Sequence, residues 1–270
     1  VLGGSAGQVI VLVWLAASRG LRAGLATRNP LGHFWRGLMG TAAMGFGFAG
    51  LGLLPLPEVT AIGYAAPLLT VVFAAMFLGE TVRAFRIFAV ALGLAGVLIV
   101  LSPRLTALRA GQIGAEEALG AIVVLVGAVF AALAQVFVRK LVTEETTSAI
   151  VFYFSVNSAL LSLVTLPFGW ATPDAAAMAM LIAAGVLGGI GQVLLTSSYR
   201  HADASVVAPF EYASMLMALG VGYVVFNEAP TLPVLGGAAL VVAAGILIIW
   251  REGRLGLERN RQRKSMTPQG

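Results

Sequence analysis

The sequence alternates between long apolar runs and short polar connections. A helix needs about 20 apolar residues to cross a hydrocarbon layer of about 30 Å. By this measure the predicted spans are residues 3–17, 34–53, 58–78, 85–102, 118–138, 148–168, 176–197, 204–226 and 232–250. Between them stand Pro, Gly and charged residues, which are typical of helix ends and turns. The pattern predicts an all-α integral membrane protein.

The composition supports this prediction and excludes other classes of protein. Of the 270 residues, 59% are hydrophobic and 11% are charged, whereas a soluble domain is about 25% charged. A soluble globular enzyme and a disordered chain are therefore both excluded. The chain has no cysteine, so disulfides, thiol nucleophiles and Cys-ligated metal sites are excluded as well.

The basic residues predict how the spans are oriented. If the C-terminal tail is cytoplasmic, 15 of the 17 Lys and Arg residues fall on that side, and only Arg104 and Arg109 fall on the other. Arg36, at the start of the second span, is counted with the cytoplasmic group. The reverse orientation would violate the positive-inside rule. We expect a multi-pass protein of the cytoplasmic (inner) membrane whose basic tail faces anionic headgroups.

A weak internal repeat runs through these spans. Residues 79–101 resemble residues 227–250, each copy opening near an acidic residue (Glu80 and Glu228) and closing on Gly and an aliphatic run. Farther upstream, YAAP at 64–67 corresponds to VVAP at 206–209. The predicted topology runs the two copies in opposite directions across the membrane. Inverted repeats of this kind are typical of secondary transporters.

The repeat also predicts the domain organisation. We expect a first repeat over 1–102, a second repeat over 118–250 and a basic cytoplasmic tail over 251–270. Nine spans leave one half a helix short of five, so we expect a further helix before Val1 and ten in all. A genuine nine-helix protein is the alternative.

Two stretches resemble a known family. Residues 53–82 and 197–252 are similar to the ends of the two repeats of EamA-type transporters, in the drug/metabolite transporter superfamily. The resemblance implies two inverted five-helix repeats around a central cavity, and alternating access without organic cofactor or metal. It further implies export of amino acids or related compounds, as in YddG-like exporters. Residues 208–212, APFEY, also resemble carriers of S-adenosylmethionine or riboflavin, so a nucleotide-like metabolite or vitamin is the alternative substrate.

Glu211 is the sharpest candidate for a substrate-binding residue. It lies eight positions into the span 204–226, and a carboxylate within the membrane usually faces the bundle interior or a wet cavity. There it could bind a cationic group of the substrate or carry a coupling proton. The alternative is a structural carboxylate that caps a helix or pairs with Arg200 or His201.

Other residues inside the spans could line the cavity. Pro67 and Pro209 would bend their helices around a central site or form structural kinks only. Trp14 and Tyr64 could supply aromatic walls. Buried polar side chains either bind substrate or join neighbouring helices; they are Gln135, Tyr153, Asn157, Gln192 and Tyr212.

Catalytic and metal-binding motifs are absent from the sequence. His33 and His201 are far apart and neither forms HExxH, there is no GxSxG elbow, and Glu144 and Glu145 are expected to be solvated. We therefore expect no catalytic residue, metal or nucleic-acid partner. The expected partners are a small-molecule substrate and the lipid bilayer, with monomer or homodimer left open. A membrane enzyme and a non-transporting sensor remain as rival classes.

Overall fold

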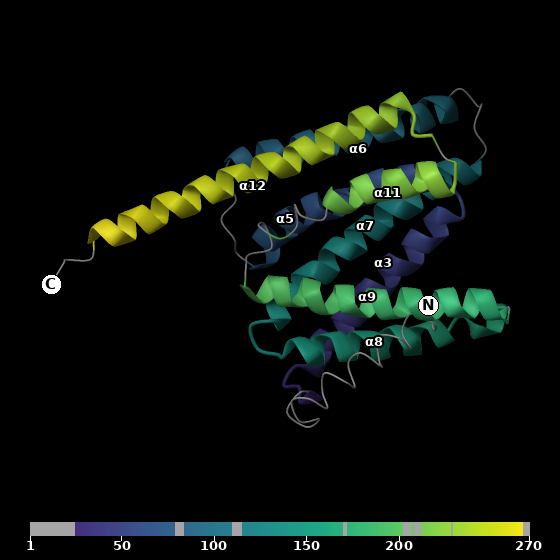
Figure 1. Cartoon of the computed structure of the whole chain (residues 1–270), viewed down its shortest axis with the longest axis horizontal. Coiled ribbons are helices and arrows are strands. Elements are labelled where there is room, and N and C mark those ends of the chain that lie inside the picture. Colours follow the sequence, from purple (N-terminus) through teal and green to yellow (C-terminus); the bar gives the residue numbers. More distant parts are fainter. Residues whose placement is uncertain are drawn as a thin grey trace. The chain divides into compact units, whose positions relative to one another are not determined.

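The structure is a computed structural model of helices joined by short connections (Figure 1). It describes residues 25–78, 84–109, 115–169, 172–201, 207, 212–227 and 229–266. Every regular element in these ranges is helical, which confirms the all-α prediction. The elements are α3 (Pro30–Leu51), α4 (Leu56–Gly63), α5 (Ala65–Leu78), α6 (Ala84–Arg109), α7 (Ala115–Leu141), α8 (Thr147–Leu163), η1 (Leu166–Phe168), α9 (Ala175–His201), α11 (Tyr212–Val225) and α12 (Leu232–Met266).

The helices follow the apolar runs of the sequence. Each predicted span from 34–53 onward overlaps a helix or a helix pair, whereas the span 3–17 lies outside the described residues. Within the described ranges, three helical segments are long and apolar enough to cross a membrane by themselves: Glu58–Leu78, Glu116–Leu141 and Ala175–His201.

The predicted span 58–78 is interrupted near its first third. α4 ends at Gly63, four residues before Pro67, and α5 begins at Ala65, two residues before Pro67. Proline has no N–H for the carbonyl four residues earlier and its ring crowds that carbonyl, which here belongs to Gly63. The break therefore falls where Pro67 removes a helical hydrogen bond. Pro67 itself is buried in α5.

Two helices run farther than the hydrophobic pattern predicts. α6 continues through Pro103 to Arg109, although the predicted span ends at residue 102. Pro103 cannot donate to the carbonyl of Ile99, and the hydroxyl of Ser102 donates to that carbonyl instead at 2.8 Å. α12 likewise continues past the predicted end at 250 to Met266. An apolar run indicates which part of a helix can lie in lipid. The hydrogen-bonded helix itself can extend past the end of that run.

The chain forms two compact units, and each unit is built from two separate stretches of the sequence. Unit 1 comprises Val1–Phe46 and Val129–Ala204, and unit 2 comprises Gly47–Ala128 and Ser205–Gly270. The division of the sequence into repeats over 1–102 and 118–250 concerns sequence similarity, and it stays a prediction.

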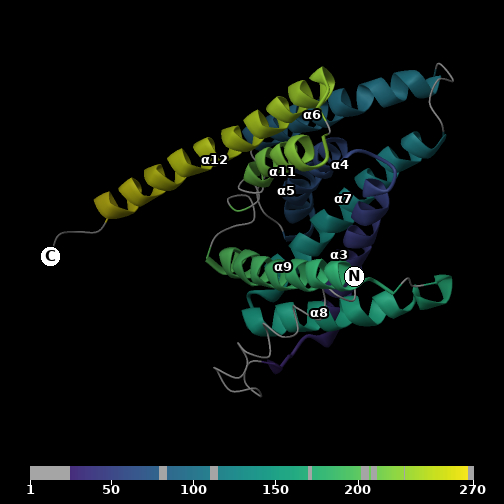
Figure 2. The ribbon, with the colours of Figure 1, turned by 45° about the vertical axis from the view of Figure 1, so that its right-hand side comes forward.

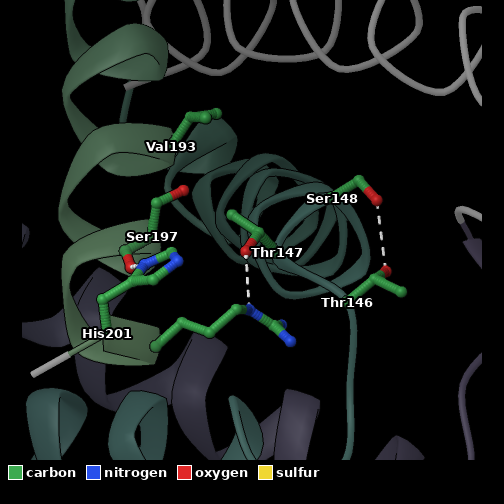
Figure 3. Close-up of a pocket in the computed structure, with 7 residues that line it drawn as sticks. Thr146, Thr147, Ser148, Val193, Ser197 and His201 are labelled. Carbon is green, nitrogen blue, oxygen red and sulfur yellow. Dashed lines mark hydrogen bonds between the residues drawn. The ribbon is translucent and has the colours of Figure 1, made fainter.

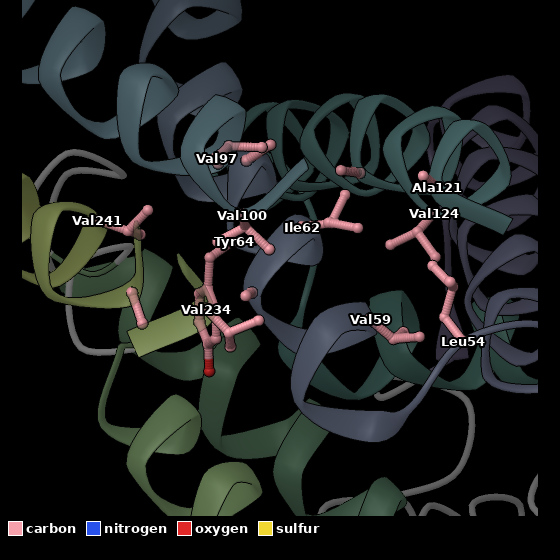
Figure 4. Close-up of a cluster of buried hydrophobic side chains, with 14 residues drawn as sticks. Leu54, Val59, Ile62, Tyr64, Val97, Val100, Ala121, Val124, Val234 and Val241 are labelled. Atoms are coloured by element: carbon pink, nitrogen blue, oxygen red, sulfur yellow. The ribbon is translucent and has the colours of Figure 1, made fainter. Parts of the chain in front are cut away.

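Unit 2 has an apolar interior. Its buried cluster draws on α4, α6, the first half of α7 and α12 (Figure 4). α6 and α12 pack side by side, as two views show (Figures 1 and 2). Their backbones approach at glycines, because a Cβ on Gly96 would lie 2.7 Å from the carbonyl oxygen of Gly237 and 3.0 Å from Cβ of Leu240. Small residues of this kind let helices approach closely in lipid.

Candidate functional site

The start of α3 is held by a buried carboxylate in unit 1. Glu145, in the connection between α7 and α8, accepts hydrogen bonds from the Thr27 hydroxyl (2.9 Å), the Arg28 N–H (2.7 Å) and the Asn29 N–H (3.1 Å). Burial of Glu145 opposes its ionisation, but these three hydrogen bonds and the nearby His33 outweigh it and hold the pKa of Glu145 below its ordinary value. The carboxylate is thus kept charged at the positive end of the α3 dipole.

The same region joins three connections of the chain. Arg200, at the end of α9, donates to the carbonyl oxygen of Glu145 and to the Thr147 hydroxyl (3.3 Å). The Tyr153 hydroxyl donates to the carbonyl oxygen of Leu25 at 3.1 Å. The span pattern assigns all three connections to the same membrane face, and in unit 1 they meet.

Arg36 is the most unusual side chain of unit 1. It lies two turns inside α3 and is 5% exposed. Nη2 donates to the side-chain oxygen of Gln192 on α9 at 3.1 Å, and the guanidinium carbon lies 3.9 Å from the ring centre of Phe154 on α8. Nε and Nη1 are buried with no hydrogen-bond acceptor among the described residues.

Gly40 makes room for this guanidinium. A Cβ on Gly40 would overlap with Nη1 of Arg36 and would lie 2.7 Å from Cε2 of Phe154. Since Gly40 is one turn farther along α3, the Arg36 side chain runs toward the C-terminal end of the helix. Helical side chains ordinarily lean the other way, toward the preceding turn.

Polar side chains from three helices reach a similar depth. The Arg36 guanidinium lies beside Gly40, which at 1.5 Å per residue is about 15 Å from the start of α3. Asn157 lies about 15 Å from the start of α8, and Gln192 lies about 14 Å from the end of α9. Half of a hydrocarbon layer is about 15 Å. Asn157 donates to the carbonyl oxygen of His33 at 3.0 Å and packs against Gly37. This polar group, defined by Arg36, Asn157 and Gln192, is hereafter the mid-depth site.

A pocket of about 380 Å³ opens nearer the helix ends. Figure 3 shows its two walls, with Thr146, Thr147 and Ser148 at the start of α8 and Val193, Ser197 and His201 on α9; Arg200 also lines it. Val193, its innermost α9 residue, directly follows Gln192 in the chain. The pocket therefore reaches along α9 to the level of the mid-depth site.

The structure places the predicted site residues in different parts of the molecule. Asn157, Gln192, Tyr153 and Gln135 belong to unit 1, and the side-chain oxygen of Gln135 is buried with no hydrogen-bond partner among the described residues. Tyr64 and Pro67 are buried in unit 2, Tyr64 within its apolar cluster. The remaining candidates are not described, wholly or in their side chains: Trp14, Pro209 and Glu211 lie outside the described residues, and Tyr212 is described only as the first residue of α11.

Three functional candidates of unit 1 were missed or misjudged from the sequence. Glu145 was expected to be solvated, but it is 5% exposed, and Glu144 alone matches that expectation. His33 directly precedes the predicted span 34–53, but it lies within α3 and is 2% exposed. Arg36 was counted as a flanking charge, but it is buried. The signal that could have revealed Arg36 is the glycine one turn later at position 40, inside an apolar run.

Comparison with known proteins gives the family. The model of the EamA-like transporter family matches residues 5–102 and 118–250, and that of Solute carrier family 35 matches residues 60–168. The chain belongs to the EamA-like transporter family. It is therefore a membrane transporter of the drug/metabolite transporter superfamily with a small-molecule substrate, and its family is one of transporters rather than enzymes.

Named relatives of this EamA-like transporter carry different solutes. An S-adenosylmethionine uptake transporter of Rickettsia bellii is 28% identical over 84% of this chain and 75% of its own. The pseudopaline exporter CntI of Pseudomonas aeruginosa is 30% identical over 79% of this chain and 72% of its own. A riboflavin transporter of Rhizobium johnstonii is 27% identical over 86% and 74%.

A solved crystal structure shares the fold. Its TM-score is 0.67 at 23% identity, and the match covers 94% of this chain and 88% of that one.

Proposed function

We propose that this EamA-like transporter carries small polar metabolites of amino-acid character across the cytoplasmic membrane by alternating access. The mid-depth site supports the proposal: measured along their three helices, the guanidinium end of Arg36, Asn157 and Gln192 lie about 15 Å from the helix ends, which would correspond to the middle of a bilayer. Secondary transporters bind substrate near the midplane. A buried polar group there is costly in lipid and calls for a function.

The named relatives support the chemical class. S-adenosylmethionine is itself an α-amino acid, and relatives for both uptake and export are named. Amino-acid export is our expectation for this chain, and riboflavin, the solute of another relative, is the second candidate. Glu211 would bind the substrate's cationic group or carry the coupling proton, and the tail would be cytoplasmic.

The pocket between α8 and α9 is the proposed cytoplasmic entrance. Its walls carry the hydroxyls of Thr146, Thr147, Ser148 and Ser197 and the side chains of Arg200 and His201. These groups hydrate well, and a small polar solute can exchange its water shell for them. From there it would pass along α9 to Gln192.

Transport by reconstituted protein tests the proposal. Liposomes would be loaded, or bathed, with labelled amino acids, S-adenosylmethionine and riboflavin, and both influx and efflux measured. We expect movement of amino acids or S-adenosylmethionine and at least a tenfold loss with Gln192→Leu. Gln262→Leu, in the extension of α12 beyond the predicted span, is the matched control.

The outcomes separate the alternatives. Movement of riboflavin alone would replace amino acids by the vitamin. A loss of transport, or of its pH dependence, in Glu211→Gln would support the role of Glu211, and unchanged transport would leave Glu211 as a structural cap. If no solute moves in either direction, the proposed function fails.

A further inference from the structure

The charge of Arg36 is buried without a counter-ion in the described part of unit 1. No described carboxylate lies within ion-pair distance of its guanidinium, since Glu145 is engaged with the start of α3 and lies 3.9 Å from His33. A cation taken out of water costs several kcal/mol unless it is paired. The Gln192 amide and the face of the Phe154 ring contact the guanidinium, and the Tyr199 side chain on α9 lies close enough to interact with its charge; none of the three is a carboxylate.

A purely structural arginine would reduce this cost by reaching for water. Long basic side chains near a helix end snorkel toward the membrane surface. α3 begins at Pro30, so snorkelling would direct Arg36 back toward that residue. It runs the opposite way, over Gly40, where a Cβ would block it. The sequence thus provides space for a guanidinium at mid-depth rather than at the surface.

The donors of Arg36 are only partly used. A guanidinium has five N–H donors and no acceptor. Nε carries one of them and Nη1 carries two, and these three meet no acceptor among the described residues. Phe154 covers one face of the group and Gln192 holds one edge, which fixes its orientation. A ligand for the unused donors must present acceptor oxygens, and a negative charge would also neutralise the buried cation.

We propose that Arg36 binds a carboxylate of the transported substrate, with Phe154 and Gln192 orienting its guanidinium and Gly40 providing its space. The proposal rests on the transport function above and deepens it, because it names the substrate group that the protein recognises. Compounds that carry a free carboxylate are substrates, and their amides, esters and decarboxylated amines are poor ones. Riboflavin, which has no carboxylate, is excluded.

Matched solutes test the recognition of the carboxylate. Reconstituted protein would be assayed with methionine and methioninamide, phenylalanine and phenylalaninamide, and S-adenosylmethionine and its decarboxylated amine. We expect the carboxylate member of a pair to move at least tenfold faster, and this ratio to fall toward one in Arg36→Gln. Arg36→Lys, which keeps the charge but not the guanidinium fork, should retain part of the ratio. Arg254→Gln, exposed on α12 beside Trp250, is the matched control and should change nothing.

A measurement without transport separates this inference from the proposed function. In detergent, sodium acetate or sodium glutamate would be compared with sodium chloride at equal ionic strength. Carboxylate binding to the folded protein should raise its unfolding temperature by about 2–4 °C in wild type but not in Arg36→Gln. If no solute moves in liposomes but this shift is found, the transport proposal fails and the carboxylate site stands.

Other results overturn the inference. Equal transport of acids and amides by wild type would do so, as would transport of riboflavin alone. An equal loss of both pair members in Arg36→Gln, with a lower unfolding temperature and no carboxylate effect, would make Arg36 a structural tie between α3 and α9. Absence of both transport and the carboxylate shift would reject both proposals together.

Discussion

The two units of the molecule are built from similarly apolar sequence but differ in what they bury. Unit 1 holds seven of the eight polar or charged side chains that are buried in the described residues: His33, Arg36, Glu145, Ser155, Ser158, Ser162 and Thr196. Unit 2 holds the eighth, Thr70, whose hydroxyl donates to the Ala66 carbonyl of its own helix at 2.9 Å. The interior of unit 2 is therefore almost wholly apolar, and the interior of unit 1 contains charge.

This difference separates scaffold from chemistry. In unit 2, small residues such as Gly96 and Gly237 bring α6 and α12 into backbone contact, which stabilises helix association by packing. In unit 1, glycine has another use, since Gly40 leaves space for the Arg36 guanidinium. The same residue type is thus expected to matter for stability in one unit and for substrate recognition in the other.

The largest effect on stability is expected at Glu145. Glu145→Ala removes the acceptor of three hydrogen bonds, so the free energy of unfolding should fall by about 2–3 kcal/mol. Glu144→Ala, at the exposed neighbour, is the control and should fall within about 0.5 kcal/mol of wild type. Both would be measured by thermal unfolding in detergent.

The stability lost in Glu145→Ala should depend on pH in a definite direction. The folded pKa of Glu145 is lowered, so its stabilisation is complete above the unfolded pKa of about 4.3. It should disappear as the pH falls through the lower folded pKa. A difference between wild type and Glu145→Ala that persists unchanged at about pH 3, or that grows on acidification, would contradict the charged hydrogen bonds described here.

A smaller stability loss is expected at the glycine contact of unit 2. In Gly96→Ala the new Cβ meets the Gly237 backbone, which cannot move aside. The free energy of unfolding should therefore be about 1–2 kcal/mol lower than in wild type. The preference among solutes should not change. Gly236→Ala, where a Cβ meets nothing within 4 Å, is the control. Equal stability of the two variants would show that α6 and α12 do not approach so closely.

The smallest effect on stability is expected at Gly40. Its substitution should mainly change which solutes are transported. A Cβ there meets Arg36 and the Phe154 ring, and the flexible arginine can move away. Stability should therefore change by less than about 1 kcal/mol, while the preference for carboxylates over amides falls about tenfold. Gly45→Ala, on α3 with open space around it, should retain the preference. A Gly40→Ala protein as selective as wild type would remove Gly40 from the site.

Some of this could be predicted from residue pattern. The apolar runs located α7 and α9 to within a few residues, because a helix in lipid must be apolar along its length. Asn157 and Gln192 stood out as amides inside the apolar runs that form α8 and α9. The ends of α6 and α12 could not be located in this way, because local hydrogen bonds such as that of Ser102 continue a helix that hydropathy no longer requires.

The sequence by itself determined that the protein is a helical membrane transporter with polar side chains inside its spans. Only the tertiary structure decided that Arg36 is an interior residue and Glu145 a buried one, although both look like surface charges in the chain. The physical reason is that burial depends on which helices meet. Gly40, Phe154 and Gln192 come from three helices, and only their packing gives Arg36 a place away from water.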